Sequence, residues 1–492
     1  MNHSTWIGRS VSRLLPSVPS AEKIPGSALN PSQLAAPENA ALRQPPARSI
    51  RERLEATLRQ EGEALSPRLL RRSLEALQAI IDPQVSEVEG GRRAMVLAEW
   101  YAGAPPEQRH DVWLLMSEQF LVDSEKARAA QARLEAAVGT PDQAVAEVHF
   151  RRSTVSPRRR LLQRFSVYPG GIEFLVELRA EISPFLKADK RLLALDVEME
   201  YMFSTWFDVG FLDLQRISWD SSASLIEKLI KYEAVHDIKS WSDVKNRLDS
   251  DRRCYGFFHP RLPGVPLIFV EVALVDEMVS HIEPLLDESA AASDLNKATT
   301  AIFYSISNTQ SGLRGVSFGD SLIKRVVETL KQEFPKLRTF ATLSPIPGFK
   351  SWLGRQAGAM LAKLDDKSRT ALERALAPEP LSAAGFLVAA GGCLALGEKS
   401  PVRLVLMQCA AHYLGQVLKE GKPMDPVARF HLGNGARVER LNWAGDLSPK
   451  GLGQSYGLMV NYLYDLKRLD KHRALLAQGK IPVSSAINDL YF

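Results

Sequence analysis

The spacing of hydrophobic residues changes near Lys190. From Ser49 to Ala188, apolar residues recur every three or four positions in stretches separated by proline, glycine or Ser-Pro, which is typical of amphipathic helices. After Lys190, runs rich in aromatic and β-branched residues are bounded by turn residues, which indicates strands. They include Arg253–His259, Pro266–Val275 and, as the last candidate, Arg437–Trp443. We therefore expect a helical bundle at residues 49–189 and a mixed α/β domain at 190–492, an α+β chain.

The segment before the bundle has a different composition. Residues 1–48 are rich in Ser, Pro and Ala, with prolines at 16, 19, 25, 31, 37, 45 and 46, and such a segment has too few large apolar residues to form a core. We expect a disordered leader. It carries Arg9 and Arg13 and no acid before Glu22, which fits a weak transit peptide or a bacterial leader.

The central stretch of the mixed domain runs from Thr300 to Lys350. Ala301 to Ser307 reads as a strand that breaks into a glycine-containing loop. A helix should follow, because apolar residues there fall on one face at helical spacing: Leu322, Ile323, Val326, Val327 and Leu330. Arg338 to Leu343 then reads as another strand. A strand, a glycine loop, a helix and a strand in this order indicate a mixed α/β sheet.

The glycine loop is a candidate phosphate site. Backbone N–H groups at the start of a helix are unpaired and carry partial positive charge, so they favour a phosphate. The alternative is a plain turn, because a short glycine pattern has little specificity. The candidate binding residues are Arg314, Gly315, Val316, Ser317, Phe318, Gly319 and Asp320.

Two further residues are candidates for chemistry. Ser344 is followed by Pro-Ile-Pro-Gly, and because proline restricts the residue before it, the hydroxyl is held at a strand end. The same motif could simply end a strand. His431 stands between Phe430 and Leu432, just before a Gly-Asn-Gly turn. It is either a structural histidine or a proton donor, since its ordinary pKa is near 6.5.

Composition excludes several classes of protein. The chain has 492 residues, 45% of them hydrophobic, and a net charge of +5, so it can bury a core and requires no polyanionic partner. Its 3 cysteines form no CxxC pair, which argues against disulfides and a thiolate metal site. The longest uncharged run, between Glu379 and Glu398, contains glycines and suggests a buried helix, and we expect no membrane association.

Six arginines lie between Arg151 and Arg164. Such a patch could bind nucleic acid or cofactor phosphates. No aromatic residue is interleaved with the arginines and no nucleic-acid motif adjoins them. A solvated or subunit-facing charged helix is therefore the favoured interpretation, and we expect no nucleic-acid partner.

The order of these motifs resembles a known family. The loop R-G-V-S-F-G resembles the pyrophosphate loop of GNAT-type acyltransferases, which holds coenzyme A. Six stretches, in family order, resemble malonyl-CoA decarboxylases: Arg252 to Pro260, Thr300 to Ser307, Gly315 to Val327, Leu343 to Phe349, Asp425 to Ala436 and Leu441 to Ser448. Together they span about half of the chain.

The resemblance implies a function and a fold. It implies a GNAT-like catalytic domain with a helical insertion, after a helical domain that carries the contacts of a dimer or tetramer. The enzyme would convert malonyl-CoA to acetyl-CoA and CO₂ through a thioester enolate, with no cofactor. Ser344 would bind the malonyl carboxylate or the thioester, and His431 would protonate the acetyl carbon. Asn434, Tyr462 and Glu271 are further polar candidates, and Glu271 replaces a histidine that is common in animal members.

Two other functions fit the same motifs. A GNAT-type acyltransferase would use the same coenzyme A loop and would need a pocket for an acceptor amine. A non-enzymatic helical scaffold would not need Ser344 and His431 in their proline and glycine settings. The expected compartment is the cytoplasm, or the mitochondrial matrix if the source is a eukaryote.

Overall fold

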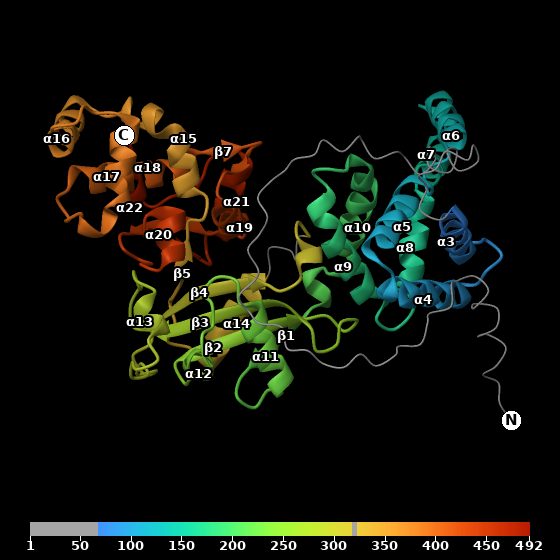
Figure 1. Ribbon diagram of the computed structural model, residues 1–492, viewed down its shortest axis with the longest axis horizontal. Coiled ribbons are helices and arrows are strands. Elements are labelled where there is room, and N and C mark those ends of the chain that lie inside the picture. The colour runs from blue at the N-terminus through green and yellow to red at the C-terminus, as the bar shows by residue number, and fades with distance from the viewer. Residues whose placement is uncertain (1–66, 317–321) are drawn as a thin grey trace, which may run out of the picture. The chain divides into compact units, whose positions relative to one another are not determined.

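The computed structural model describes residues 67–316 and 322–492 of the chain (Figure 1). The expected leader at 1–48 and residues Ser317 to Asp320 of the glycine loop lie outside the described residues. The described chain forms two compact units. One contains residues 67–205 with Gln310–Val316, and the other contains Trp206–Thr309 with residues 322–492.

The first unit is helical, as the sequence predicts. Its helices are α3 (Pro67–Ile80), α4 (Glu87–Gly103), α5 (Pro106–Glu118), α6 (Ser124–Ala137), α7 (Gln143–Ser153), α8 (Pro157–Phe165), α9 (Gly171–Ile182) and α10 (Leu193–Trp206). The core of this unit is formed by apolar stripes such as Leu70, Leu77 and Ile80 of α3, which are at most 2% exposed.

Helix α10 belongs with these helices, so the division between the units falls after Thr205 and not near Lys190. The reason is a set of buried polar contacts. Arg179 Nε on α9 donates to Asp196 Oδ1 at 2.8 Å, and Arg159 Nε on α8 donates to Glu198 Oε1 at 2.6 Å. Because both acceptors lie on α10, that helix is fixed to the bundle.

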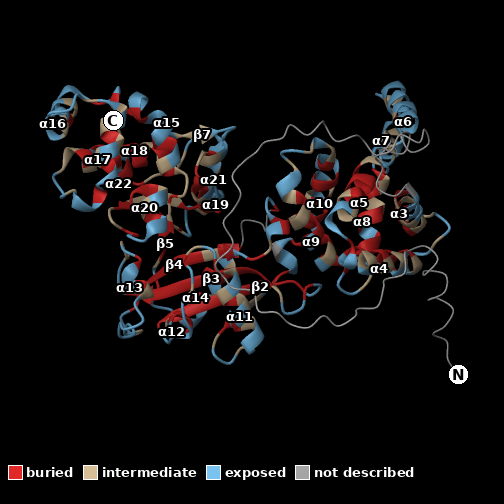
Figure 2. Ribbon diagram, viewed as in Figure 1, coloured by how far each residue is buried: buried red, intermediate tan, exposed pale blue. Residues whose placement is uncertain are grey.

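Helices α6 and α7 pack mainly against each other. Ala130 is the only buried residue on α6, and α7 has none. Exposed valines lie along and beside α7, with Val145 58% and Val148 48% exposed. Figure 2 shows α6 as exposed along its length. Most helical stability comes from burying an apolar face. The α6–α7 hairpin buries almost no side chains within the described chain, so it lacks this usual source of stability.

The second unit contains a mixed sheet. Its path is β1 (Asp213–Ile217), β2 (Arg252–Phe258), β3 (Pro266–Val275), β4 (Thr300–Asn308), β5 (Thr339–Thr342), β10 (Met459–Leu463) and β6 (Ser344–Pro345), with β9 (Arg437–Asn442) paired to β10. Strands β4 and β5 are parallel, and the other named pairs are antiparallel. Strands β2 and β3 are buried along their whole length, so helices cover both faces.

Neighbouring residues of β2 show which helices cover which face. Cys254 packs in a cluster with residues of α11 (Ala223–Tyr232) and α12 (Trp241–Arg247), whereas Tyr255 lines a pocket with α14 (Leu322–Glu333). Successive side chains of a strand point to opposite faces, so α11 and α12 lie on one face and α14 on the other. The five apolar residues predicted to share one face of α14 are all buried.

The predicted helical insertion follows Ser344. It consists of α15 (Phe349–Leu361), α16 (Asp366–Leu376), α17 (Ala383–Gly391) and α18 (Pro401–Gln416). The strand pair β7 (Leu418–Lys419) and β8 (Lys422–Pro423) leads to α19 (Pro426–Gly433), and α20 (Pro449–Ser455) lies between β9 and β10. Helix α13 (Glu283–Leu286) follows β3, and α21 (Leu469–Ala477) and α22 (Ser485–Asn488) end the chain.

The uncharged run between Glu379 and Glu398 is not a buried helix. Helix α17 covers only nine of its residues, and Val388 and Leu394 are 78% and 67% exposed. The helix ends at the glycine pair 391–392, because glycine favours helix termination. Val388 lies on its exposed face, and Leu394 lies beyond its end. Within residues 67–316 and 322–492, no helix is long and apolar enough to cross a membrane.

Candidate active site

Ser344 is the first residue of β6 and follows β5 closely in the sequence. Val460 of β10 pairs with Ser344, and Met459 pairs with Pro345, so the partner strand fixes the serine backbone. The Ser344 side chain is buried, and its hydroxyl donates to Thr342 Oγ1 at 2.8 Å. Thr342 Oγ1 also accepts the backbone N–H of Tyr462 at 3.1 Å. The serine hydroxyl is therefore positioned by two strands.

His431 lies on α19, a short helix that is well defined at its N-terminus. Asp425 is the N-cap, with its side chain accepting the N–H groups of Val427 and Ala428, and Pro426 is the first helical residue, where its missing N–H costs nothing. The sequence predicts a turn directly after His431 and no helix around it. The helix directs the imidazole inward, and His431 is 4% exposed.

The structure brings the two predicted catalytic residues together. His431 Nε2 lies 3.3 Å from Ser344 Oγ, and His431 Nδ1 lies 2.7 Å from Tyr464 Oη. Since the single hydroxyl hydrogen of Ser344 goes to Thr342, we assign Nε2–H as donor to Ser344 and Nδ1 as acceptor from Tyr464. Neutral His431 thus carries its proton on the nitrogen that faces the serine.

The imidazole is enclosed by aromatic rings. Tyr462 stacks on it with ring centroids 4.7 Å apart and an interplanar angle of 25°. Burial lowers the pKa of His431 from 6.5 to about 3, because desolvation disfavours the charged form. His431 is therefore neutral at pH 7, whereas the sequence suggested a histidine that holds a second proton there with little tuning.

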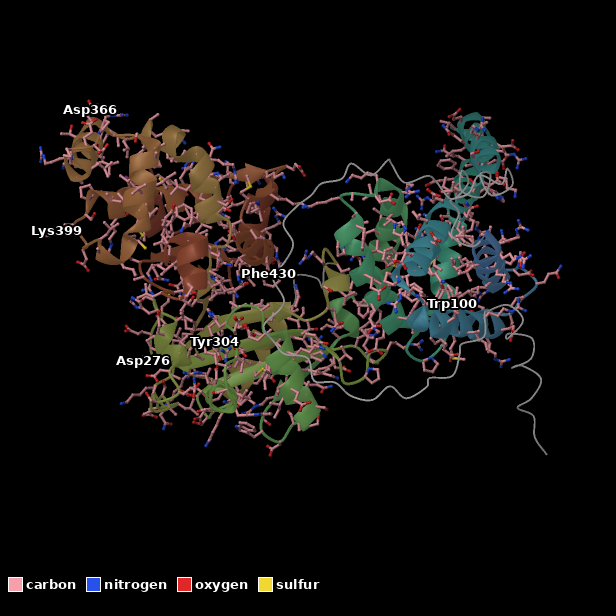
Figure 3. All side chains as sticks on the ribbon, in the orientation of Figure 1. Trp100, Asp276, Tyr304, Asp366, Lys399 and Phe430 are labelled. Carbon is pink, nitrogen blue, oxygen red and sulfur yellow. The ribbon has the colours of Figure 1, made fainter. Side chains whose placement is uncertain are left out.

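A pocket of about 220 Å³ opens onto Ser344 and His431. Its other lining residues come from β4, from β6, from the loop after α11 and from α19: Val235, Phe303, Tyr304, Ile306, Asn308, Pro345, Pro426, Val427 and Phe430. Tyr304 lies on the sheet and Phe430 on a helix (Figure 3). The walls are mostly apolar, with a few polar groups at one end, as is usual for small-molecule sites.

The pocket exists because β4 and β5 separate. They pair from Thr300 to Phe303, and the N–H of Leu343 reaches Phe303 O at 3.0 Å. Beyond Phe303, β4 continues to Asn308 and pairs there with β3 but not with β5. Thr309 N–H donates to Leu267 O on the β3 side. Along an antiparallel strand, residues that bond one neighbour alternate with residues that face the other way, so the backbone groups of Ile306 and Asn308 face away from β3. Those groups border the pocket.

The described part of the glycine loop belongs to the helical unit. Gln310–Val316 packs on α9, and the buried guanidinium of Arg179 donates to Gly312 O at 2.9 Å and Arg314 O at 2.8 Å. Gly315 has φ +86°, which strains any residue with a side chain. Ser317, Phe318, Gly319 and Asp320 lie outside the described residues.

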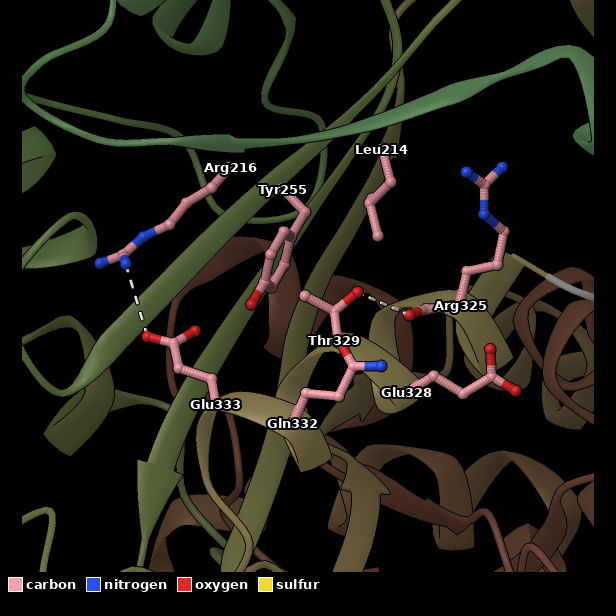
Figure 4. A pocket seen from close by; sticks show the side chains of 8 residues that line it. All are labelled: Leu214, Arg216, Tyr255, Arg325, Glu328, Thr329, Gln332 and Glu333. Atoms are coloured by element: carbon pink, nitrogen blue, oxygen red, sulfur yellow. Dashed lines mark hydrogen bonds and ion pairs between the residues drawn. The ribbon is translucent and has the colours of Figure 1, made fainter.

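A second pocket, of about 360 Å³, lies between β1, β2 and α14 (Figure 4). Most of its charged side chains have partners, some of them outside the pocket lining. Glu333 accepts Arg253 Nη2 at 2.6 Å and Arg216 Nη1 at 3.4 Å, and Arg325 Nη1 donates to Leu212 O at 2.6 Å. Neither Ser344 nor His431 lines this pocket.

The other polar candidates from the sequence have different surroundings. Asn434 Nδ2 donates to Phe430 O at 2.8 Å and so caps the end of α19. Glu271 is fully buried on β3 and pairs with Arg247 Nη1 at 2.9 Å, outside the pocket lining. Burial raises the pKa of Glu271 to about 8, with Glu233 acting in the same direction.

Sequence reasoning missed Thr342 and Tyr464. Both could have been found from strand alternation. Thr342 is two residues before Ser344, and Tyr464 is two residues after Tyr462, so each pair points to one side of the chain if it is extended. The sequence does not predict strand β10, because the last clear strand pattern along the chain is the one that forms β9, at Arg437–Asn442.

Several side chains of the arginine-rich segment make hydrogen bonds and ion pairs within the helical unit. Arg158 and Arg164 are buried. Arg158 donates to the carbonyl groups of Met116, Ser117 and Ala194, and Arg164 pairs with Glu87. Among the described residues, no group of three or more His, Cys, Asp or Glu side chains is placed to hold a metal ion.

Comparison with known proteins identifies the family. Residues 210–491 match the malonyl-CoA decarboxylase C-terminal domain, and residues 120–207 match the N-terminal domain. The mitochondrial malonyl-CoA decarboxylase of Anser anser anser is 34% identical over 440 residues, which are 83% of this chain and 84% of that protein. The Rattus norvegicus protein of the same name is 39% identical over 337 residues, 65% of this chain and 68% of that one.

Two solved structures are similar. The malonyl-CoA decarboxylase from Rhodopseudomonas palustris is 40% identical, with a TM-score of 0.74 and coverage of 85% of this chain and 99% of that one. The enzyme of that name from Cupriavidus metallidurans is 41% identical, with a TM-score of 0.70 and coverage of 86% and 100%. With both domains matched and relatives aligned over most of its length, this chain belongs to the malonyl-CoA decarboxylase family.

Proposed function

We propose that the chain is a malonyl-CoA decarboxylase, which converts malonyl-CoA to acetyl-CoA and CO₂ at the pocket lined by Ser344 and His431. The observation that carries the proposal is the 3.3 Å contact between these two side chains at the end of an apolar pocket. Serine offers a hydrogen-bond donor and histidine a transferable proton, and both meet where the sheet opens.

The pantetheine arm of the substrate would lie along β4. The backbone groups of Ile306 and Asn308 that face away from β3 can bond the amides of an extended chain, as an added strand does. The pyrophosphate would bind Arg314 to Asp320 through backbone N–H groups. Arg179 supports this assignment, because it holds the beginning of that loop through two carbonyl groups.

The chemistry requires stabilised negative charge and one proton. When the bond between the carboxylate and the α-carbon breaks, CO₂ leaves and its electron pair forms the thioester enolate. The Ser344 hydroxyl, turned from Thr342 Oγ1 to the substrate, would donate to the malonyl carboxylate or the enolate oxygen, and such a donor is worth about 3 kcal/mol. Protonation of the α-carbon then gives acetyl-CoA.

His431 is the proton donor in this scheme. It begins neutral, since burial lowers its pKa to about 3. A malonyl carboxylate placed in the same pocket raises that pKa, because a nearby opposite charge favours the imidazolium. With substrate bound, His431 takes up a proton from solvent and becomes the imidazolium. As CO₂ leaves, the negative charge moves to the enolate, and the Nε2 proton passes to the α-carbon, which returns His431 to its neutral form. One proton from solvent is consumed in each turnover.

The direct test is a turnover assay. Purified full-length protein is mixed with malonyl-CoA without any amine, and acetyl-CoA and CO₂ are measured. Equal amounts of the two products are the expected result. An acyltransferase would instead transfer acetyl from acetyl-CoA to an added amine, and the absence of CO₂ release from malonyl-CoA would overturn the proposal. His431→Asn is the matched inactive control.

Assembly and compartment belong to the same proposal. The chain forms a dimer or tetramer through its helical domain, and the α6–α7 hairpin supports this because it buries almost nothing within the chain. The relatives named above from Anser anser anser and Rattus norvegicus are mitochondrial. We place this protein in the mitochondrial matrix if its source is a eukaryote and in the cytoplasm otherwise.

A further inference from the structure

Asp425 is a buried carboxylate, 1% exposed, that does not line the pocket. Its Oδ1 accepts the N–H groups of Val427 at 2.9 Å and Ala428 at 3.1 Å. Its Oδ2 accepts the N–H of Gly348 at 3.2 Å, with the Tyr413 hydroxyl at 3.4 Å. One side chain therefore joins two segments that are 77 residues apart in the sequence.

The two segments are those that carry the catalytic pair. On one side, Asp425 caps α19, which holds His431 within its second turn. On the other, Gly348 lies in a turn shortly after strand β6, which begins at Ser344. Prolines at 345 and 347 restrict the backbone of residues 344–348, which we call the Ser344 turn. A displacement of Gly348 relative to α19 would therefore be transmitted to the distance between Ser344 and His431.

The fit at Gly348 is close. A Cβ atom there would lie 2.3 Å from Tyr413 Oη and 3.4 Å from Asp425 Oδ2, so a larger residue must displace one of them. Burial raises the pKa of Asp425, while the three N–H groups that donate to it act in the opposite direction. Charged acceptors make stronger hydrogen bonds than neutral ones, so a carboxylate suits this position.

We propose that Asp425 is a positioning residue that sets the spacing of Ser344 and His431 by fastening the Ser344 turn to the N-terminus of the His431 helix. The inference rests on the proposed function, since it assumes that these two residues carry the reaction. It goes further in naming a group, outside the pocket, on which their geometry depends. A misplacement of about 1 Å can cost about 10²-fold in rate.

Asp425→Asn separates the two roles of the side chain. Asparagine is as good an N-cap as aspartate, so its oxygen can accept from Val427 and Ala428. Its NH₂ group then faces the N–H of Gly348, and two donors cannot bond. The helix keeps its cap and loses its connection to the turn. Asp425→Ala removes both.

We expect Asp425→Asn to lower kcat by about tenfold or more, with a smaller change in KM, in a protein that remains folded. Its melting temperature should fall modestly, because the N–H of Gly348 loses its acceptor. The matched control is Asp365→Asn. Asp365 caps α16, where it accepts the N–H of Ser368 at 2.6 Å, and that helix carries no candidate residue. A wild-type kcat in folded Asp425→Asn would overturn the proposal.

Two further variants complete the test. If Asp425→Asn fails to fold, Gly348→Ala disturbs the same connection from the other side, and a wild-type kcat there overturns the proposal instead. In a Ser344→Ala background, Asp425→Asn should cost far less than in the wild type, because it acts through Ser344. If Ser344→Ala alone retains full turnover, the assignment of Ser344 fails. If Ser344→Ala loses turnover but Asp425→Asn retains full turnover, only the positioning role of Asp425 fails.

Discussion

Tyr464 Oη lies 2.7 Å from His431 Nδ1, on the side of the ring opposite Ser344. Burial raises the pKa of Tyr464 above its ordinary value, so the phenol keeps its proton and can donate to Nδ1. This bond favours the tautomer with the proton on Nε2. A tyrosine that the sequence analysis overlooked thus determines which nitrogen faces the substrate.

Tyr464→Phe should lower kcat by about tenfold, because the imidazole loses the group that orients it and selects its tautomer. The KM for malonyl-CoA should change less, since Tyr464 does not line the pocket. The comparison variant is Tyr462→Phe, which retains the stacked ring. It should lose less activity than Tyr464→Phe, and the reverse order would contradict the tautomer assignment.

His431→Asn should lower kcat by at least about 10²-fold with little effect on binding, because asparagine cannot deliver a proton at neutral pH. Ser344→Ala should cost about 3 kcal/mol in the transition state if the hydroxyl contacts developing charge. Both are measured by steady-state kinetics. The double variant should be far less damaged than the sum of the single effects, and simple additivity would mean that the two residues act separately.

Acid should destabilise the protein partly through His431. Its pKa is 6.5 when unfolded and about 3 when folded, so between these values the unfolded state binds more protons and stability falls as pH falls. At pH 5 the loss from this residue is about 2 kcal/mol. His236, whose pKa burial lowers to about 4, adds to the effect.

Chemical unfolding of wild type and His431→Asn at pH 7 and pH 5 measures this contribution. The variant should lose less stability between the two pH values than the wild type, because it lacks the buried imidazole. An equal loss in both proteins would mean that His431 takes up its proton in the folded protein as readily as in the unfolded chain.

Gly315→Val should raise the KM for malonyl-CoA strongly if the loop seats a pyrophosphate. A side chain there blocks close approach, and the glycine has φ +86°. Because strain alone could change the loop, Gly139→Val is the control. Gly139 has φ +78° in the same helical unit, with open space around it. An unchanged KM in folded Gly315→Val would place the phosphate elsewhere.

Val148→Glu should weaken the oligomer if the α6–α7 hairpin forms a subunit contact. Val148 is 48% exposed, so a charge there costs the single chain little, whereas it would be desolvated in an interface. Light scattering of the full-length protein reports the mass. The control is Val388→Glu, an exposed valine outside the helical unit, and equal effects of both variants would count against the hairpin.

The sequence predicts the main elements well where local pattern decides them. The strands at 252–258, 266–275 and 300–308, the helix from Leu322 and the strand Arg437–Asn442 all form, because their periodicity and turn residues are local signals. Strands β1 and β10 were not predicted. Strand β1 lies in a stretch of scattered aromatic residues, and β10 follows a glycine-rich helix, α20, so neither has clear flanking signals.

The site is predicted only in part, for a related reason. Ser344 and His431 stand in motifs that single them out, but their 3.3 Å contact joins residues 87 positions apart, which no local pattern encodes. The lowered pKa of His431 likewise arises from its burial. Asp425 could be recognised from the sequence as a helix cap, whereas its bond to Gly348 depends on tertiary structure.

The tether of Gln310–Val316 by Arg179 has a thermodynamic consequence. That segment is folded as part of the helical unit although the chain on either side of it belongs to the other. If the loop binds coenzyme A, as we propose, part of the ligand's binding free energy depends on a unit that contains neither Ser344 nor His431. By linkage, coenzyme A should raise the unfolding temperature of the helices, and Arg179→Ala should uncouple their melting from ligand concentration.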